Sequence, residues 1–552
     1  MTTTAPEVRS SRGEGHARAG GPHTGTGPLV RLMLRRDRIK LPAWALGTGM
    51  LVLYVGAAVP AVAPTIEELG SIVPMLQQPV GRMFTGPAYG LDAPTYERVF
   101  ASGYALYVYL LAALMNIMLV TRHTRLEEQS GRAELVRANV AGRHAPLTAA
   151  LVVAVITNAL TALVVLGAAL AVGFELPGAL LVAAATGAVG LAFAGITALT
   201  VQLSGFSRGA AGIAGLVLGA SFVLRAVGDM AAIGGSALSW ASPLGWAAQT
   251  APFVLDRWWP LLLHVALAVV TTAAAFALQR RRDLGAGLVA TRPGRPQAAP
   301  ALGTPWGLAA RLQRGPALAW GIAVVAMALV DALFAQVMVE SVDDLPDAFK
   351  DVFGADALLA GYIAFLGVFS GYLTAAYVVY AVQALRGEEK AGRAEAVLAT
   401  PTSRAAWAGG HYATIGAAAV VIMLAAGVLA GVGAAAVTGD WGLLPETAFT
   451  HVNLIPAVLV VLGVCALLHG WAPALLAPVG WALVAVMVFV GNFAAMMDAP
   501  EWVIKLSPLS YPAHYPVEDL EVRTLVVLLV IAIALVALGL VGLRRRQVVG
   551  RS

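Results

Sequence analysis

The chain has little charge, a single cysteine and few lysines. Only 12% of its 552 residues are charged, whereas 59% are hydrophobic and the mean hydropathy is +0.77. A typical soluble domain has about a quarter of its residues charged. So few charges exclude a soluble enzyme of this length. The single cysteine, Cys465, excludes an intrachain disulfide, a CxxC redox pair and a cysteine zinc cluster.

The sequence also lacks the motifs of a nucleotide-hydrolysing or metal-dependent enzyme. Its four lysines are Lys40, Lys350, Lys390 and Lys505, and none stands in a GxxxxGK[ST] string, which cradles the phosphates of ATP. The histidines are scattered, so no catalytic triad and no metal site is nominated. We therefore expect no catalytic residue, no metal and no cofactor in this chain, and no enzyme activity of its own.

Apolar runs of membrane-crossing length occur twelve times, six in each half of the chain. The sequence therefore predicts an all-α polytopic membrane protein. The predicted spans lie near 42–62, 100–120, 147–172, 178–200, 209–227, 259–279, 316–339, 357–383, 409–437, 452–470, 474–493 and 524–543. The tenth and eleventh are the least secure, because no positive charge marks the turn between them.

The positions of lysine and arginine predict the orientation of these spans. With the N-terminus inside, 29 of the 36 basic residues lie in inner segments and six in outer loops, and Arg225 lies near the outer end of a span. Positive charge is retained on the cytoplasmic side during insertion. We therefore expect both termini to be cytoplasmic in a bacterial plasma membrane. The basic charge serves orientation, so no nucleic-acid partner is expected.

The segments outside the spans predict the remaining organisation. Residues 1–28 are polar and read as a disordered cytoplasmic tail, and residues 29–41 as an interfacial helix at the start of the first half, 29–282. A proline-containing linker, 283–307, leads to the second half, 308–546, in which 308–314 is a shorter interfacial helix. Residues 547–552 form a second tail.

One inner segment occurs twice. Arg125–Val136 aligns without gaps with Arg386–Val397 at an offset of 261, and eight of twelve positions are identical, most of them charged or glycine. We call 121–146 and 384–408 the first and second repeat segments. A Ser-Pro-Leu loop after the fifth span and an Arg-Arg-Arg run after the sixth also recur. The sequence therefore predicts two six-helix repeats, parallel in the membrane.

The repeat segments have two interpretations. Glu128 precedes Arg132 by four residues, as Glu389 precedes Arg393, which predicts ion pairs on short surface helices. In one interpretation these helices dock a soluble partner; in the other they are solvated loops whose arginines only set orientation. Two copies favour docking, because orientation gains little from repeated glutamates.

The repeat segments and the Ser-Pro-Leu loops resemble ABC-2 type exporter permeases, and the two-half form resembles the actinobacterial multidrug and polyketide-antibiotic exporter permeases. The resemblance implies that two copies of a soluble ABC ATPase, which bind ATP and Mg²⁺, dock on coupling helices in these segments. The implied coupling residues are Glu127, Glu128, Gly131, Arg132, Glu134, Glu388, Glu389, Gly392, Arg393 and Glu395. The implied outer re-entrant loops contain Ser242, Pro243, Leu244, Ser507, Pro508 and Leu509. The first segment departs from the family pattern over Arg137–Arg143, which predicts unequal contacts with the two ATPases.

A few residues inside spans are candidates for a substrate pathway. They are Tyr104, Tyr107, Tyr362, Phe365, Phe369, Tyr372 and Asp331. The last four aromatic residues share one helix face, so they either pack between helices or line a pathway. Asp331 either binds a cation or makes an interhelical hydrogen bond. For His264 and His469 we favour hydrogen bonds to neighbouring backbone, and for Arg225 a side chain that reaches the outer surface.

Together these features predict the permease subunit of an ATP-driven exporter of hydrophobic small molecules, embedded in membrane lipid. The alternative is a proton-coupled secondary drug transporter with twelve helices, which has the same two parallel halves.

Overall fold

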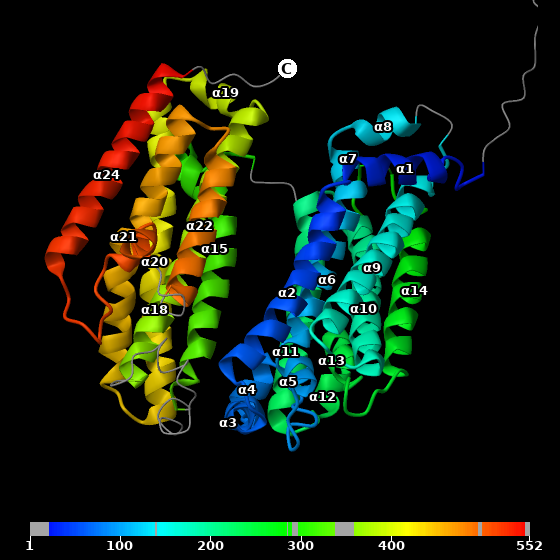
Figure 1. Cartoon of the computed structure of the whole chain (residues 1–552). Coiled ribbons are helices and arrows are strands. Elements are labelled where there is room, and N and C mark those ends of the chain that lie inside the picture. The colour runs from blue at the N-terminus through cyan, green and yellow to red at the C-terminus, as the bar shows by residue number, and fades with distance from the viewer. Residues whose placement is uncertain are drawn as a thin grey trace, which may run out of the picture. The chain divides into compact units, whose positions relative to one another are not determined.

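The structure is a computed structural model that describes residues 21–137, 141–283, 285–289, 296–336, 358–494 and 500–546. In these ranges the chain is helical and contains no strand. It divides into two compact units, Met1–Arg292 and Pro293–Ser552, and the boundary between them lies inside the predicted linker. Each unit is a bundle of long helices (Figure 1).

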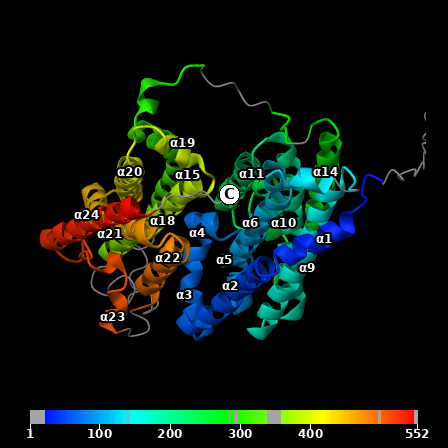
Figure 2. The ribbon, with the colours of Figure 1, turned by 90° about the horizontal axis from the view of Figure 1, so that it is seen from above.

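Unit 1 contains six long helices with short helices at both ends of the bundle. Helix α1 lies across one end and packs on α9, as the views of Figures 1 and 2 show. The helices are α1 (Thr26–Arg36), α2 (Lys40–Val62), α3 (Ile66–Gln77), α4 (Pro79–Phe84), α5 (Tyr96–Gly103), α6 (Ala105–His123), α7 (Arg125–Gln129), α8 (Arg132–Arg137), α9 (Ala145–Ala171), α10 (Leu176–Leu203), α11 (Ser207–Ala231), α12 (Ala237–Trp240), α13 (Pro243–Ala248) and α14 (Pro260–Gln279).

Unit 2 is built around α21, which packs on α18, α20 and α24. Its elements are η1 (Pro300–Gly303), α15 (Pro305–Ala332), α18 (Leu358–Lys390), α19 (Arg393–Leu398), α20 (Arg404–Thr438), α21 (Leu443–Trp471), α22 (Leu476–Phe493), α23 (Glu501–Ile504), η2 (Pro508–Ser510) and α24 (Val522–Arg545).

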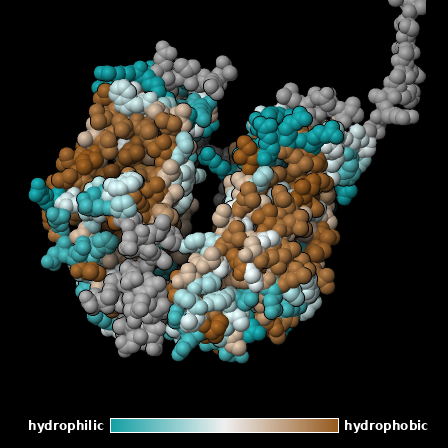
Figure 3. All heavy atoms as spheres, viewed as in Figure 1, coloured by the Kyte–Doolittle hydropathy of each residue, from teal (hydrophilic) through white to brown (hydrophobic). Residues whose placement is uncertain are grey.

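Eleven of the described helices are long and apolar enough to cross a membrane. Hydrophobic side chains cover the middle of each unit, and hydrophilic ones collect towards its ends (Figure 3). The prediction of an all-α polytopic membrane protein is therefore confirmed. Each of the eleven corresponds to a predicted span, and the twelfth, 474–493, corresponds to the shorter apolar helix α22.

Three predicted boundaries were wrong. Helix α1 begins at Thr26, so the tail predicted to extend to residue 28 is too long. Helix α15 continues through Pro316, so 308–314 is no separate interfacial helix. Helix α21 begins nine residues before the predicted 452, because its polar residues bond inside the unit: Thr447 donates to the Leu443 carbonyl and Thr450 to that of Tyr515.

The prediction for Arg225 was also wrong. Its side chain is 0% exposed and forms an ion pair of 3.0 Å with Asp229, one turn further along α11. Ser239 donates to the other oxygen of the Asp229 carboxylate, and Arg82 donates to the Asp229 carbonyl. A buried charge is costly unless it is paired and hydrogen-bonded. This network therefore fixes α4 and α12 to the end of α11.

The middle of unit 1 is held by two asparagines that pair across α6 and α9. Asn116 and Asn158 donate to each other's side-chain oxygens at 3.0 and 2.8 Å, and each also donates to a carbonyl of its own helix. The pair needs close approach of α10, where a Cβ at Gly190 would lie 1.9 Å from Asn158 Oδ1. The absence of a side chain at position 190 therefore leaves the space that the two paired asparagines occupy.

We expect Gly190→Ala to destabilise the protein by about 1–3 kcal/mol, because the new methyl group must displace the paired amides. The matched control is Gly187→Ala in the same helix, where a Cβ would make only ordinary contacts at 3.7 and 3.8 Å. The thermal unfolding midpoint of the purified full chain measures both. Equal midpoints for the two variants would contradict this account.

Candidate coupling sites

The first repeat segment folds as two short helices joined at a left-handed glycine. Helix α7 follows directly on the long helix α6, and Gly131, with φ 72°, separates α7 from α8. A residue with a side chain rarely adopts this conformation. Across the turn the Arg132 guanidinium donates to the Glu127 carboxylate at 2.8 Å. This hydrogen bond raises the pKa of Arg132, so the pair is ionised at neutral pH.

The second repeat segment repeats this geometry. Helix α18 ends at Lys390, Gly392 has φ 71°, and Arg393 donates to the Glu388 carboxylate at 2.7 Å. The bond to Glu388 raises the pKa of Arg393. The repeat predicted from the sequence therefore extends to individual contacts.

The predicted pairs Glu128–Arg132 and Glu389–Arg393 were wrong. A four-residue spacing brings two side chains together only along a continuous helix. Here the left-handed glycine interrupts the helix between them, and the arginine turns back to the first glutamate of each Glu-Glu pair. The second glutamate is left to a different partner.

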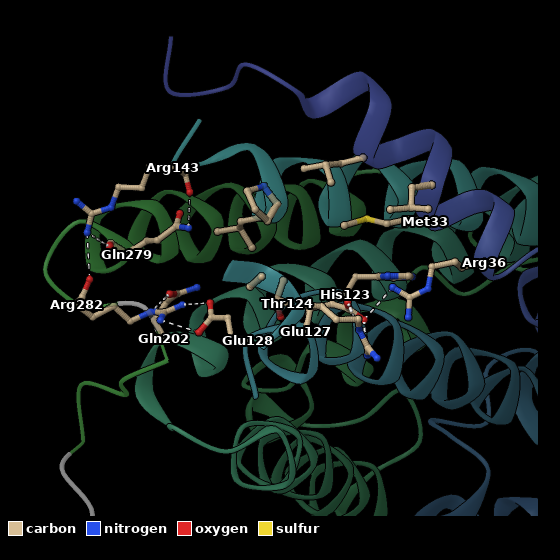
Figure 4. Close-up of a pocket in the computed structure, with 16 residues that line it drawn as sticks. Met33, Arg36, His123, Thr124, Glu127, Glu128, Arg143, Gln202, Gln279 and Arg282 are labelled. Atoms are coloured by element: carbon tan, nitrogen blue, oxygen red, sulfur yellow. Dashed lines mark hydrogen bonds and ion pairs between the residues drawn. The ribbon is translucent and has the colours of Figure 1, made fainter. Parts of the chain in front are cut away.

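That partner is an arginine at the end of the sixth span. In unit 1 the Arg282 guanidinium donates to both oxygens of Glu128, at 2.7 and 3.0 Å, and its Nε donates to Gln202 at the end of α10. Arg125, which is 0% exposed, also donates to Glu128 at 2.6 Å. Figure 4 shows Arg282 between Glu128 and Gln202. Because two parallel hydrogen bonds join the guanidinium to the carboxylate, they fix the relative orientation of Arg282 and Glu128 as well as their distance.

In unit 2 the Arg546 guanidinium donates to the two oxygens of Glu389 at 2.7 and 2.8 Å. His469, at the end of α21, lies 3.0 Å from the same carboxylate and 2.6 Å from the hydroxyl of Tyr412. The prediction that backbone satisfies His469 was therefore wrong. For His264 it is confirmed, because Nε2 donates to the Pro243 carbonyl at 2.8 Å. We call the pairs Glu128–Arg282 and Glu389–Arg546 the two latches.

A further arginine in each repeat segment caps the same helix end. Arg143 donates to the carbonyls of Gln279 and Arg282, at 2.6 and 3.1 Å. Arg404 donates to the carbonyls of Arg544 and Arg546, at 3.3 and 2.6 Å. The last carbonyls of a helix have no partner within the helix and carry partial negative charge. Both ends of each repeat segment are thus fixed to the last span of the unit.

The first repeat segment has additional ties to the start of the chain. Arg36 of α1 contacts Glu127 at 3.0 Å, and buried Asp37 contacts Arg122 and His123 at 2.9 and 2.6 Å. The backbone amides of residues 142 and 144 also donate to the carbonyls of residues 24 and 22. The predicted departure of the first segment begins at Arg137, and residues 138–140 lie outside the described residues.

The outer face of each repeat segment remains accessible. Glu134 of α8 and Glu395 of α19 are exposed, and Leu126 has 41% of its surface exposed.

The pocket drawn in Figure 4 lies between α1, α7 and α9 and has a cavity volume of about 70 Å³. Sites for drug-sized ligands are about 300–1,000 Å³. A surface contact therefore suits this region better than a small ligand does.

The two Ser-Pro-Leu loops lie inside their units. Ser242 accepts from the amide of Gly245 and donates to the Ser221 carbonyl, which starts α13 with Pro243 in its first turn. Leu244 is 0% exposed. In unit 2, Ser507 and Pro508 begin η2, and Leu509, 4% exposed, packs on Gly371 of α18.

The aromatic stripe on α18 divides into two kinds of residue. Tyr362 and Tyr372 are 6% and 3% exposed, and the Tyr362 hydroxyl donates to the backbone carbonyl of Asp331 at 2.5 Å. Phe365 and Phe369 stack with ring centroids 6.0 Å apart. The two tyrosines therefore pack within unit 2. Tyr104 and Tyr107 lie in unit 1 and are 36% and 37% exposed, and their predicted place in a substrate pathway stays a prediction.

We expect the first latch to couple energetically across the 154 residues between its members. A double-mutant cycle of Glu128→Gln and Arg282→Gln should give an interaction energy of about 1–3 kcal/mol, because both side chains are nearly buried, at 11% and 6% exposed. Unfolding of the purified chain in a denaturing detergent measures it. The control cycle uses Glu501 and Lys505, an exposed pair at 78% and 55%, which should show no measurable coupling. If the interaction energy between Glu128 and Arg282 is as small as that of the control pair, the proposed role of the latch is wrong.

Comparison with known proteins agrees with this architecture. The model of the family described as multidrug efflux system permease Rv1217c, C-terminal domain, matches residues 27–280 and 302–544. These ranges include both repeat segments and the latch glutamates Glu128 and Glu389. The multidrug efflux system permease protein Rv1217c of Mycobacterium tuberculosis is 34% identical over 557 residues, covering 99% of this chain and 100% of that protein. The match over the whole length of both chains places the two proteins in one group. The chain belongs to the family of multidrug efflux system permeases.

Proposed function

We propose that this chain is the membrane subunit of an ATP-driven exporter, and that two copies of a soluble ATPase dock on its two repeat segments. The proposal rests on one observation: the same arrangement of repeat segment and latch occurs in both units. In each unit a latch joins the acidic segment at the end of one span to an arginine that follows the last span. A segment that served orientation alone would need neither the glutamates nor the latch.

The geometry suits transmission of a push. Arg125, in the first turn after α6, donates through Nε to the Val201 carbonyl of α10 at 3.1 Å, while Glu128 holds Arg282 beyond the end of α14. A force on α7 and α8 therefore acts on the ends of α6, α10 and α14 together. Removing one partner from a nearly buried ion pair is costly, so the latch stays closed while the segment moves.

The exposed carboxylates define where the partner contacts the chain. Glu127, Glu128, Glu388 and Glu389 are occupied by arginines of this chain. Glu134 of α8 and Glu395 of α19 are exposed and lie outside the latches. In this proposal they meet basic residues of the ATPases, which bind ATP and Mg²⁺, and both termini of the permease lie in the cytoplasm. The cargo is a hydrophobic drug or polyketide-type antibiotic, in line with the family resemblance and with the name of the mycobacterial relative.

We expect Glu134→Lys combined with Glu395→Lys to release the ATPase without unfolding the permease, because both residues are exposed and lie outside the latches. The tagged full chain is purified from native membranes, and the bound ATPase is identified by mass spectrometry through its Walker motifs. Loss of at least about tenfold in co-purified ATPase is expected when the attractive charges become repulsive.

The matched control is Glu67→Lys on α3, an exposed glutamate at the other end of unit 1, which should retain the ATPase (Figure 1). Undiminished co-purification with the double variant would refute the docking role. A purified chain that drives drug transport with a proton gradient, without any ATPase or ATP, would instead establish a secondary transporter.

A further inference from the structure

A second cavity opens in unit 1, between the beginning of α2, the end of α6 and the beginning of α11. Its volume is about 340 Å³, large enough for part of a ligand rather than for water alone. One part of its lining is apolar, with Trp44, Met115 and Met118. The other part contains three basic residues and the carboxylate of Asp37. Neither part belongs to the latches.

Three basic side chains line this cavity, and two of them are uncompensated. Arg122 forms an ion pair with Asp37 at 2.9 Å. Lys40 and Arg208 are exposed, and among the described residues neither makes an ion pair. Arg208 also stands in the first turn of α11, a helix of 25 residues whose N-terminal end carries partial positive charge. The cavity is therefore poised for an anion.

A buried hydroxyl in the lining points to the same kind of ligand. Thr121 is 7% exposed, and its Oγ1 has no hydrogen-bond partner among the residues that the structure describes. Thr124, three residues further, shows the usual alternative, because its hydroxyl donates to the Val120 carbonyl at 2.6 Å. A buried polar group without a partner is unfavourable. An oxygen of a bound molecule would satisfy it.

We propose that this cavity binds the headgroup of an anionic phospholipid. The phosphate lies between Lys40 and Arg208 and accepts a hydrogen bond from Thr121, and an acyl chain runs along Trp44 and Met118. The depth fits a lipid, because Lys40 is the first residue of α2 and Arg208 the second of α11, so the charges stand where spans leave the hydrocarbon. Free phosphate would gain nothing from the apolar wall. The bound lipid ties together the ends of three spans beside Asp37, which joins α1 to α6.

The test uses the full chain, purified and stripped of lipid in a neutral detergent. Binding of dioctanoyl phosphatidylglycerol, dioctanoyl phosphatidylcholine and inorganic phosphate is measured by calorimetry, and the thermal midpoint is recorded for each. Phosphatidylglycerol should bind and raise the midpoint, phosphatidylcholine should bind at least tenfold more weakly, roughly as loss of the charge attraction demands, and inorganic phosphate should not compete at equal concentration.

Three variants locate the site. Lys40→Gln with Arg208→Gln should weaken phosphatidylglycerol binding about thirtyfold, since each charge near the surface contributes about a factor of five. Thr121→Val should weaken it about fivefold, and should leave the midpoint of the lipid-free protein unchanged or higher because an unpartnered hydroxyl is removed. The control Arg31→Gln, an exposed basic residue of α1 outside the cavity lining, should leave binding within about twofold.

Equal binding of phosphatidylcholine, full competition by inorganic phosphate, or an unchanged affinity of the double variant would each overturn the proposal. So would an exported drug that displaces phosphatidylglycerol and depends on the same three residues, because the cavity would then be a substrate site. We expect the ATPase to co-purify with the Lys40→Gln, Arg208→Gln double variant whether or not the variant binds lipid. The lipid test can therefore fail without affecting the proposed function.

Discussion

A nearly buried ion pair between a repeat segment and the end of the last span is the constraint on which each unit depends. Glu128 and Arg282 are 11% and 6% exposed, so the carboxylate and the guanidinium have given up most of their water. Leaving either charge unpaired would be costly, and only a small range of side-chain orientations allows both hydrogen bonds between them. The remaining contacts follow from it: Arg132 is left to Glu127, and Arg143 caps the carbonyls beside Arg282.

The spans could be predicted from the sequence because the bilayer imposes their length. Eleven predicted spans correspond to helices, and errors concentrate where polar residues extend a helix, as at the beginning of α21. That extension could not be predicted from the residues alone, because Thr447 and His451 are polar and their partners within unit 2 are visible only in the fold. Between the first two predicted spans the chain forms two further helices, α3 and α4, and Arg82 of α4 donates to the Asp229 carbonyl of α11.

The candidate site could be predicted in position but not in pairing. The repeated charged residues located both segments, and the repeated Arg-Arg-Arg runs were visible as a second signal. What the sequence could not supply is which glutamate each arginine takes. That choice depends on Gly131 and Gly392, whose left-handed conformation redirects the chain, and on partners 154 and 157 residues away. Spacing along a helix says nothing about either.

The two units share the latch but differ in what surrounds it. The place of Gln202 beside the first latch is taken by His469 beside the second. The pair Arg225–Asp229 has no counterpart in unit 2, where the offset of 265 between the Ser-Pro-Leu loops leads to Val490 and Ala494. Val490 and Ala494 carry no charge, so the ion pair that holds the end of α11 is not repeated at these two positions of unit 2.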